Sequence, residues 1–218
     1  MSLKQNAIRG AMWSALEKWG GQFASTAIFL LLARLLGTKA FGLVALASVF
    51  LAFMQIFLDQ GFAQAIIQRD ELEPEHLDTA FWTSVLMGLL FVLLVFVGAE
   101  SVASFYREPE LAPIIRWMSL SFLFSGLSSV QTAILQRRMH FKVLAARSLI
   151  ATVACGITGI GAALMGLGVW SLVVKEITFG FTGAVLLWST SNWKPGFRFS
   201  PKHFKELFSF GINILGFN

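Results

Sequence analysis

The chain has 218 residues, of which 56% are hydrophobic and only 13% are charged, and its formal net charge is +5. A soluble domain usually carries about 25% charged residues, so this composition excludes an ordinary soluble domain. Apolar residues gather in blocks of roughly 20, the length that an α-helix needs to cross a bilayer core of ~30 Å. The sequence therefore predicts an all-α integral membrane protein.

Six membrane spans are predicted in chain order. They cover residues 6–36, 41–67, 80–99, 114–135, 149–167 and 169–188, and residues 204–218 begin a seventh helix. We expect a six-helix lobe over residues 1–190, a cytoplasmic connecting loop over 191–203 and the start of the next helix over 204–218. Because residues 210–218 stop within a helical pattern, without a C-cap arrangement, we expect the sequence to be truncated.

The distribution of basic residues predicts the orientation. Most of the 17 lysines and arginines lie at the N-terminus and in the connections after the second, fourth and sixth spans. Cytoplasmic loops are enriched in these residues, so the N-terminus is predicted to be cytoplasmic.

The acidic stretch "RDELEPEHLD" lies in the connection between the second and third spans. Pro74 breaks the chain there, and Asp78 or Thr79 is expected to cap the third span. A solvated turn is the simpler interpretation, and a docking site for a partner is the alternative.

Small residues are concentrated in the fifth span, in "CGITGIGAALMGLG". Ala162 and Gly166 have a small-xxx-small spacing that lets helices pack closely. A bending point in a moving helix is the alternative, since glycine tolerates unusual backbone angles.

Charged residues inside the spans are candidate functional groups, because each costs roughly 2.5–3.5 kcal/mol at mid-bilayer and usually faces a polar interior. Arg34 lies near an outer end, where it either extends to the interface or faces a cavity. Asp59 either caps a helix that restarts after Gly61 or faces the interior, with Gln64 nearby. Lys175 and Glu176 lie farther inside the sixth span. As neighbours they point ~100° apart, so we expect them not to pair, and at least one to face inward.

Signals for catalysis and cofactor binding do not occur in the sequence. There is no G-x-x-x-x-G-K-[ST] phosphate-binding loop and no G-x-S-x-G nucleophile motif. The three histidines are far apart, and Cys155 is the single cysteine. We therefore expect neither an enzyme nor a bound metal or cofactor, and we interpret Cys155 as a small apolar helix residue.

Six motifs, in order along nearly the whole chain, resemble a known family. They are "ARLLGTKAFGLVALA", "LDQGFAQAIIQR", "LDTAFW", "LQRRMHFKVLAARSL", "GLGVWSLV" and "NWKPGFRFSPKHFKELFSFGINILGFN". Each resembles a segment of bacterial oligosaccharide and lipopolysaccharide flippases of the Wzx type, in the colanic-acid-exporter-like branch. These proteins belong to the multidrug/oligosaccharidyl-lipid/polysaccharide exporter superfamily.

The resemblance implies a transporter of the bacterial cytoplasmic membrane, with two six-helix lobes around a central cavity. It would flip an undecaprenyl-diphosphate-linked repeat unit to the outer leaflet by alternating access. The implied partners are the lipid-linked oligosaccharide, membrane lipid and, as a further candidate, the polysaccharide polymerase machinery; no nucleic acid is expected. Residues 174–176 depart from the family pattern, where uncharged polar residues are expected.

The candidate substrate-path residues are Arg34, Asp59, Gln64, Lys175 and Glu176. Cations and amides suit a diphosphate and its sugars, and Asp59 and Glu176 are candidates for protonation during transport. Two alternatives stay open. A multidrug or metabolite exporter would have an acidic, aromatic-lined cavity, and a non-transporting scaffold of a polysaccharide assembly complex would have no polar cavity between its helices.

Overall fold

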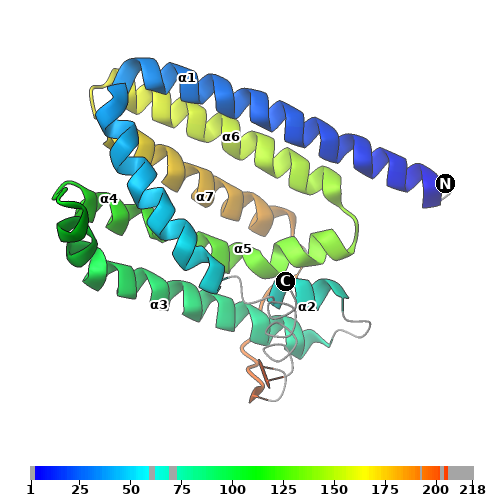
Figure 1. Cartoon of the computed structure of the whole chain (residues 1–218). Coiled ribbons are helices and arrows are strands. Elements are labelled where there is room, and N and C mark those ends of the chain that lie inside the picture. The colour runs from blue at the N-terminus through cyan, green and yellow to red at the C-terminus, as the bar shows by residue number, and fades with distance from the viewer. Residues whose placement is uncertain (1–2, 59–61, 69–72, 192, 202–203, 206–218) are drawn as a thin grey trace.

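The computed structural model consists of α-helices, and no strand occurs among the residues that it describes (Figure 1). Those residues are 3–58, 62–68, 73–191, 193–201 and 204–205, with the backbone alone described for 3–18, 57–58, 62 and 68. The helices are α1 (Leu3–Leu58), α2 (Phe62–Gln68), α3 (Pro74–Tyr106), α4 (Leu111–Met118), α5 (Leu120–Arg137), α6 (Phe141–Leu164) and α7 (Trp170–Thr190). The prediction of an all-α protein is confirmed.

Within the described part of the chain, 5 helical segments are long and apolar enough to cross a membrane. One of them, Trp19–Ile56, has 38 residues and would be about 57 Å long if straight, nearly twice a bilayer core. Gly37 breaks it with φ 74° and ψ 178°, a backbone conformation that favours glycine. Figure 1 shows the two legs of α1 meeting at a sharp bend, so α1 folds back on itself. Together with the other long apolar helices, this makes the chain a multi-pass membrane protein.

Several predicted boundaries are wrong. Only Gly37 interrupts the helix where a loop was expected between residues 36 and 41. The predicted span 41–67 ends at Leu58, and α2 is a separate short helix. Hydropathy placed the fifth span at 149–167, whereas α6 covers Phe141–Leu164, because basic side chains at a helix end lower the hydropathy without ending the helix. The predicted seventh helix lies almost entirely outside the described residues.

Glycines set the distances between neighbouring helices. A Cβ on Gly126 of α5 would lie 2.6 Å from the carbonyl oxygen of Ser84, and a Cβ on Gly88 of α3 would lie 2.7 Å from that of Phe122. The α3 and α5 backbones therefore touch at two glycines. Gly166 instead lies in the turn after α6, with φ 78°, so the predicted Ala162–Gly166 packing pair is wrong.

The apolar core is densest toward the end of the bundle that contains the α1 bend. Buried residues of α1, α3, α4, α5 and α7 meet there, among them Leu43, Val95, Ile115, Phe122 and Val173. Lys39, just after the bend, forms a 2.8 Å ion pair with Glu110, which precedes α4. The opposite end contains α2 and the connection between α5 and α6, and Arg137 Nη1 there donates to the carbonyl oxygen of Ile66 at 2.9 Å.

Candidate functional site: a polar cavity among apolar helices

A cavity of about 650 Å³ lies between the helices and extends along most of α5. Its walls come from α1, α2, α3, α5, α6 and α7. The lining residues are Gln55, Ala63, Gln64, Ile67, Ser84, Ser121, Phe124, Ser125, Ser128, Ser129, Thr132, Gln136, Arg147, Glu176, Phe179 and Gly180. Most of these side chains carry a hydroxyl, an amide or a charge, so polar groups are distributed over the wall although the helices are mainly apolar.

One face of α5 provides much of this polar wall. Its six polar lining residues are Ser121, Ser125, Ser128, Ser129, Thr132 and Gln136. They recur every three or four positions, so they share one helical face and extend over roughly 22 Å along the axis. The predicted fourth span was interpreted by its mean hydropathy, which hides such a stripe. The 3.6-residue period of the serines was the signal that could have revealed it.

Arg147 is the cation of the cavity wall, and sequence reasoning missed it. It was counted with the basic loop after the fourth span, but α6 begins at Phe141, which puts Arg147 almost two turns into the helix. Its Nε donates to the carbonyl oxygen of Gly183 on α7 at 3.1 Å. A Cβ on Gly183 would lie 2.9 Å from Arg147 Nη2, so the absence of a side chain there lets the guanidinium lie against α7.

A second cavity, of about 320 Å³, adjoins the first between α5, α6 and α7. Arg147, Thr132, Gln136 and Phe179 line both cavities. Arg147 therefore lies where the two cavities meet, beside α5 and α7.

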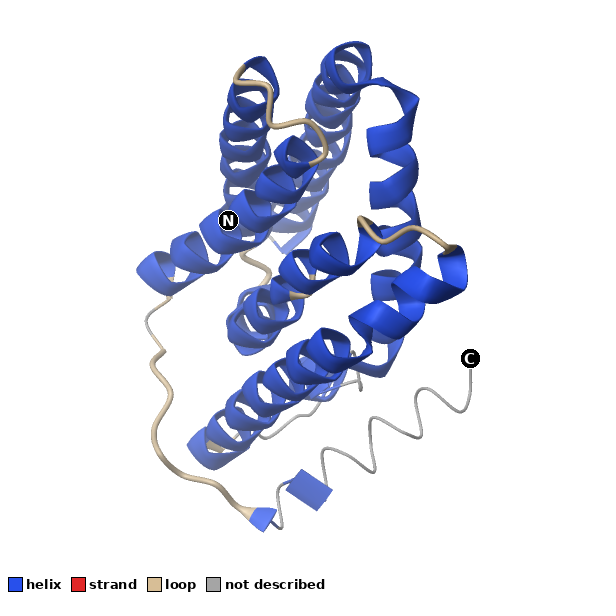
Figure 2. Ribbon diagram, turned by 90° about the vertical axis from the view of Figure 1, so that its left-hand side faces the viewer, coloured by secondary structure: helices blue, strands red, loops and turns tan. Residues whose placement is uncertain are grey.

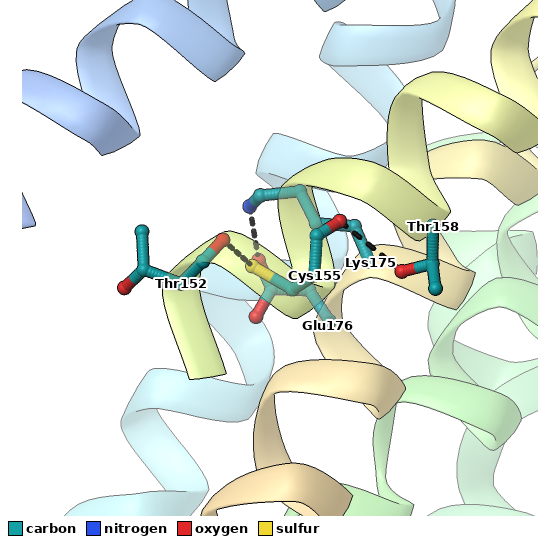
Figure 3. A network of polar contacts seen from close by, with 5 residues as sticks. All are labelled: Thr152, Cys155, Thr158, Lys175 and Glu176. Carbon is teal, nitrogen blue, oxygen red and sulfur yellow. Dashed lines mark hydrogen bonds and ion pairs between the residues drawn. The ribbon is translucent and has the colours of Figure 1, made fainter. Parts of the chain in front are cut away.

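Glu176 lines the larger cavity, as an inward-facing residue would, and it is bound to its neighbour. Lys175 Nζ lies 2.8 Å from Glu176 Oε1, and Figure 3 shows the pair beside Cys155 and Thr158 of α6. The expectation that these two residues do not pair is wrong, because long flexible side chains can bend across the ~100° between their Cβ directions. Gly159 makes room for this contact, since a Cβ there would lie 3.0 Å from Lys175 Cβ.

The other candidate residues lie in different places. Gln64 of α2 is in the cavity wall. Arg34 is exposed on the first leg of α1, near the bend, and is not among the residues that line either cavity. Asp59 lies outside the described residues, so its two interpretations remain predictions.

Among the described residues, the wall of the cavity combines hydroxyls, amides, one cation and one anion. Buried polar groups without partners are unfavourable, so a cavity of this kind is stable only when water or a polar ligand occupies it. Hydroxyls and amides can both donate and accept hydrogen bonds, which suits a ligand rich in hydroxyls. The guanidinium of Arg147 presents several donors to anionic oxygens.

We predict that the cavity contains water. With Cys155 replaced by alanine, a cysteine at Ser129 should react readily with a water-soluble thiol reagent, because water in the cavity allows the thiolate to form. A cysteine at Leu93, which is 57% exposed on the apolar face of α3, should react at least about tenfold more slowly in a bilayer because lipid surrounds it. Labelling rates measured by mass spectrometry test this, and equal rates at the two positions would contradict it.

The fold and the site define a class: a multi-pass α-helical membrane protein with a polar cavity between its helices. The chain belongs to the family described as polysaccharide biosynthesis protein, whose profile matches residues 31–218. The expected kinship with polysaccharide exporters is thereby confirmed.

The chain is also similar to three named proteins. The chain is 28% identical to the teichuronic acid biosynthesis protein TuaB of Bacillus subtilis, over 100% of this chain and 47% of that protein. It is 29% identical to the succinoglycan biosynthesis transport protein ExoT of Rhizobium meliloti, over 97% and 43%. It is 27% identical to the lipopolysaccharide biosynthesis protein WzxC of Escherichia coli, over 92% and 41%. The chain thus spans less than half the length of these relatives. No solved structure matches it.

Proposed function

We propose that this chain is the N-terminal lobe of a transporter that flips a lipid-linked oligosaccharide across the bacterial cytoplasmic membrane by alternating access. The observation that carries the proposal is the stripe of serine, threonine and glutamine side chains on α5, which lines a cavity inside an apolar bundle. Sugars supply many hydroxyls that could pair with this wall. Arg147 supplies a cation for the phosphate groups that join sugar and lipid.

The names of the relatives support the same proposal. One is called a transport protein for succinoglycan biosynthesis and another a lipopolysaccharide biosynthesis protein, and both belong to systems that build polysaccharides. The sequence of this chain has no nucleotide-binding loop. We therefore propose that an ion gradient or the substrate gradient drives transport. Each charge that crosses ~100 mV contributes ~2.3 kcal/mol, and Glu176 in the cavity wall is a candidate carrier.

The two alternatives fit the cavity less well. An exporter of cationic drugs would favour several acids and aromatic rings, whereas the described residues of the wall include Glu176 as their acid, Arg147 as their cation and two phenylalanines. A scaffold without a transport path has no use for a cavity lined by hydroxyl and amide side chains between its helices.

The test of the proposed function is complementation. The full-length protein should restore surface polysaccharide in a strain that lacks its own flippase and accumulates lipid-linked repeat units. Flow cytometry with a polysaccharide-specific lectin measures the restored export. Unchanged accumulation in cells that contain normal amounts of the protein in the membrane would contradict the proposal.

The proposed orientation has its own test. Because basic residues follow the second, fourth and sixth predicted spans, a phosphatase reporter fused after Arg138 should be inactive in the cytoplasm, and one fused after Glu108 should be active outside. The reverse pattern would overturn the proposed cytoplasmic N-terminus.

A further inference from the structure

The connection that follows α7 is bound to the first turns of α3 through the backbone of one residue. Trp82 Nε1 donates a hydrogen bond to the carbonyl oxygen of Gly196 (2.8 Å), and the N–H of Gly196 donates to Asp78 Oδ1 (2.9 Å). Asp78 and Trp82 stand four apart on α3, so they present neighbouring side chains to the same peptide. We call residues 193–200 the strap; Figure 2 shows this extended stretch in tan.

We call the two hydrogen bonds of Gly196, to Trp82 and to Asp78, the clamp; it requires glycine at position 196. A Cβ there would lie 2.6 Å from Asp78 Oδ2. Asp78 is only 4% exposed, so its carboxylate cannot move aside into water. Its hydrogen bond to the Gly196 N–H is shielded from water, so a lost donor there could not be replaced easily by solvent.

Further contacts along the strap are made to the same turn of α3. The N–H of Ser200 donates to Thr79 Oγ1 at 3.2 Å, and the Phe197 ring stacks on the Trp82 ring with centroids 5.3 Å apart. Thr79 is fully buried. The expectation that Asp78 or Thr79 caps α3 is therefore wrong. The helix begins at Pro74, with Glu73 as its N-cap residue. The side chains of Asp78 and Thr79 bind the strap instead.

We propose that the strap is a fixed pivot, clamped to α3 throughout transport, so that the six-helix lobe and the strap move as one body. Any movement of the chain that follows the strap, relative to the helices before it, would then begin after Ser200. Opening the clamp would leave the buried Asp78 carboxylate without its backbone donor, which strongly disfavours the open form. The inference rests on the proposed alternating-access function, because only a moving transporter needs such a pivot.

Hydrogen exchange tests the clamp without reference to transport. In the purified protein, the slowest amides of peptide 191–200 should exchange at least about tenfold faster in Gly196→Ala and in Asp78→Ala than in the unchanged protein, since breaking the clamp opens these hydrogen bonds. Gly161→Ala is the matched control, because no atom lies within 4 Å of its added Cβ. Equal exchange in all four proteins would overturn the clamp.

A cross-link tests whether the clamp stays closed. Glu75 and Arg198 lie near each other, with Arg198 Nη1 3.9 Å from Glu75 Oε1, and neither takes part in the clamp. Cysteines at these positions, with Cys155 replaced by alanine, can be joined by a short bismaleimide in the full-length protein. A fixed pivot predicts that transport continues at the rate of the unjoined protein. Loss of transport on joining would show that the strap has to open, and would overturn the proposal while leaving the proposed function intact.

Discussion

Replacing Arg147 by glutamine is expected to reduce polysaccharide export by about tenfold or more while leaving insertion into the membrane unchanged. The substitution removes the cation from the cavity wall but keeps a polar side chain of similar length. A hydrogen bond to a charged group contributes roughly 1.5–3 kcal/mol, and 1.4 kcal/mol corresponds to a factor of ten. Export by the full-length protein in the flippase-deficient strain, normalised to the amount of protein in the membrane, measures the effect.

Two further variants show whether the effect comes from the charge at this position. Arg138→Gln removes an exposed cation at the end of α5, outside both cavities, and should leave export close to normal. Gly183→Ala keeps Arg147 but places a Cβ 2.9 Å from its Nη2, so it should lower export by displacing the guanidinium. If Arg138→Gln impaired export as much as Arg147→Gln, the effect would reflect general charge and not the cavity.

Gly126→Ala is expected to destabilise the bundle by about 1–3 kcal/mol relative to Gly98→Ala. The added Cβ on Gly126 would lie 2.6 Å from the Ser84 carbonyl oxygen, so α3 and α5 would have to move apart. At Gly98, which lies within α3, a Cβ meets no atom within 4 Å. Both changes gain the same helix propensity of roughly 1 kcal/mol, so the difference between them isolates the packing effect.

Thermal unfolding of the two variants in detergent provides this comparison. For a chain of this size, each kcal/mol corresponds to a change in Tm of roughly 2–4 °C. Gly126→Ala should therefore unfold at a temperature several degrees below Gly98→Ala. Equal Tm values would mean that the helices adjust without loss, and that the close approach of α3 and α5 does not contribute to stability.

Hydropathy predicted the helical membrane fold because long apolar blocks are a direct signature of membrane spans. It could not predict the cavity. Arg147 was assigned to a loop because the apolar block begins eight residues after the helix does. The serines of α5 are only mildly polar, so their periodic placement disappears in a window average.

Contacts between side chains were harder to predict from the sequence than the helices themselves. The ion pair of Lys175 and Glu176 depends on how two flexible side chains bend, and Cβ directions alone do not determine this. The contact of Asp78 with Gly196 joins residues 118 positions apart, so a local pattern suggested a helix cap instead. Gln64 and Glu176 were placed in the cavity wall by the structure, whereas the substrate-path role assigned to them from sequence remains a prediction.

Blocking the cavity reversibly is the most direct test of its role in transport. The full-length protein with Cys155→Ala and Ser129→Cys would be reconstituted into vesicles with a fluorescent undecaprenyl-diphosphate-linked saccharide, and its flipping measured before and after a bulky methanethiosulfonate reagent modifies the cysteine. If the cavity is part of the transport path, flipping should stop on modification and return when a reductant removes the reagent. Flipping at an unchanged rate, with the cysteine fully modified, would contradict a role of the cavity in the transport path.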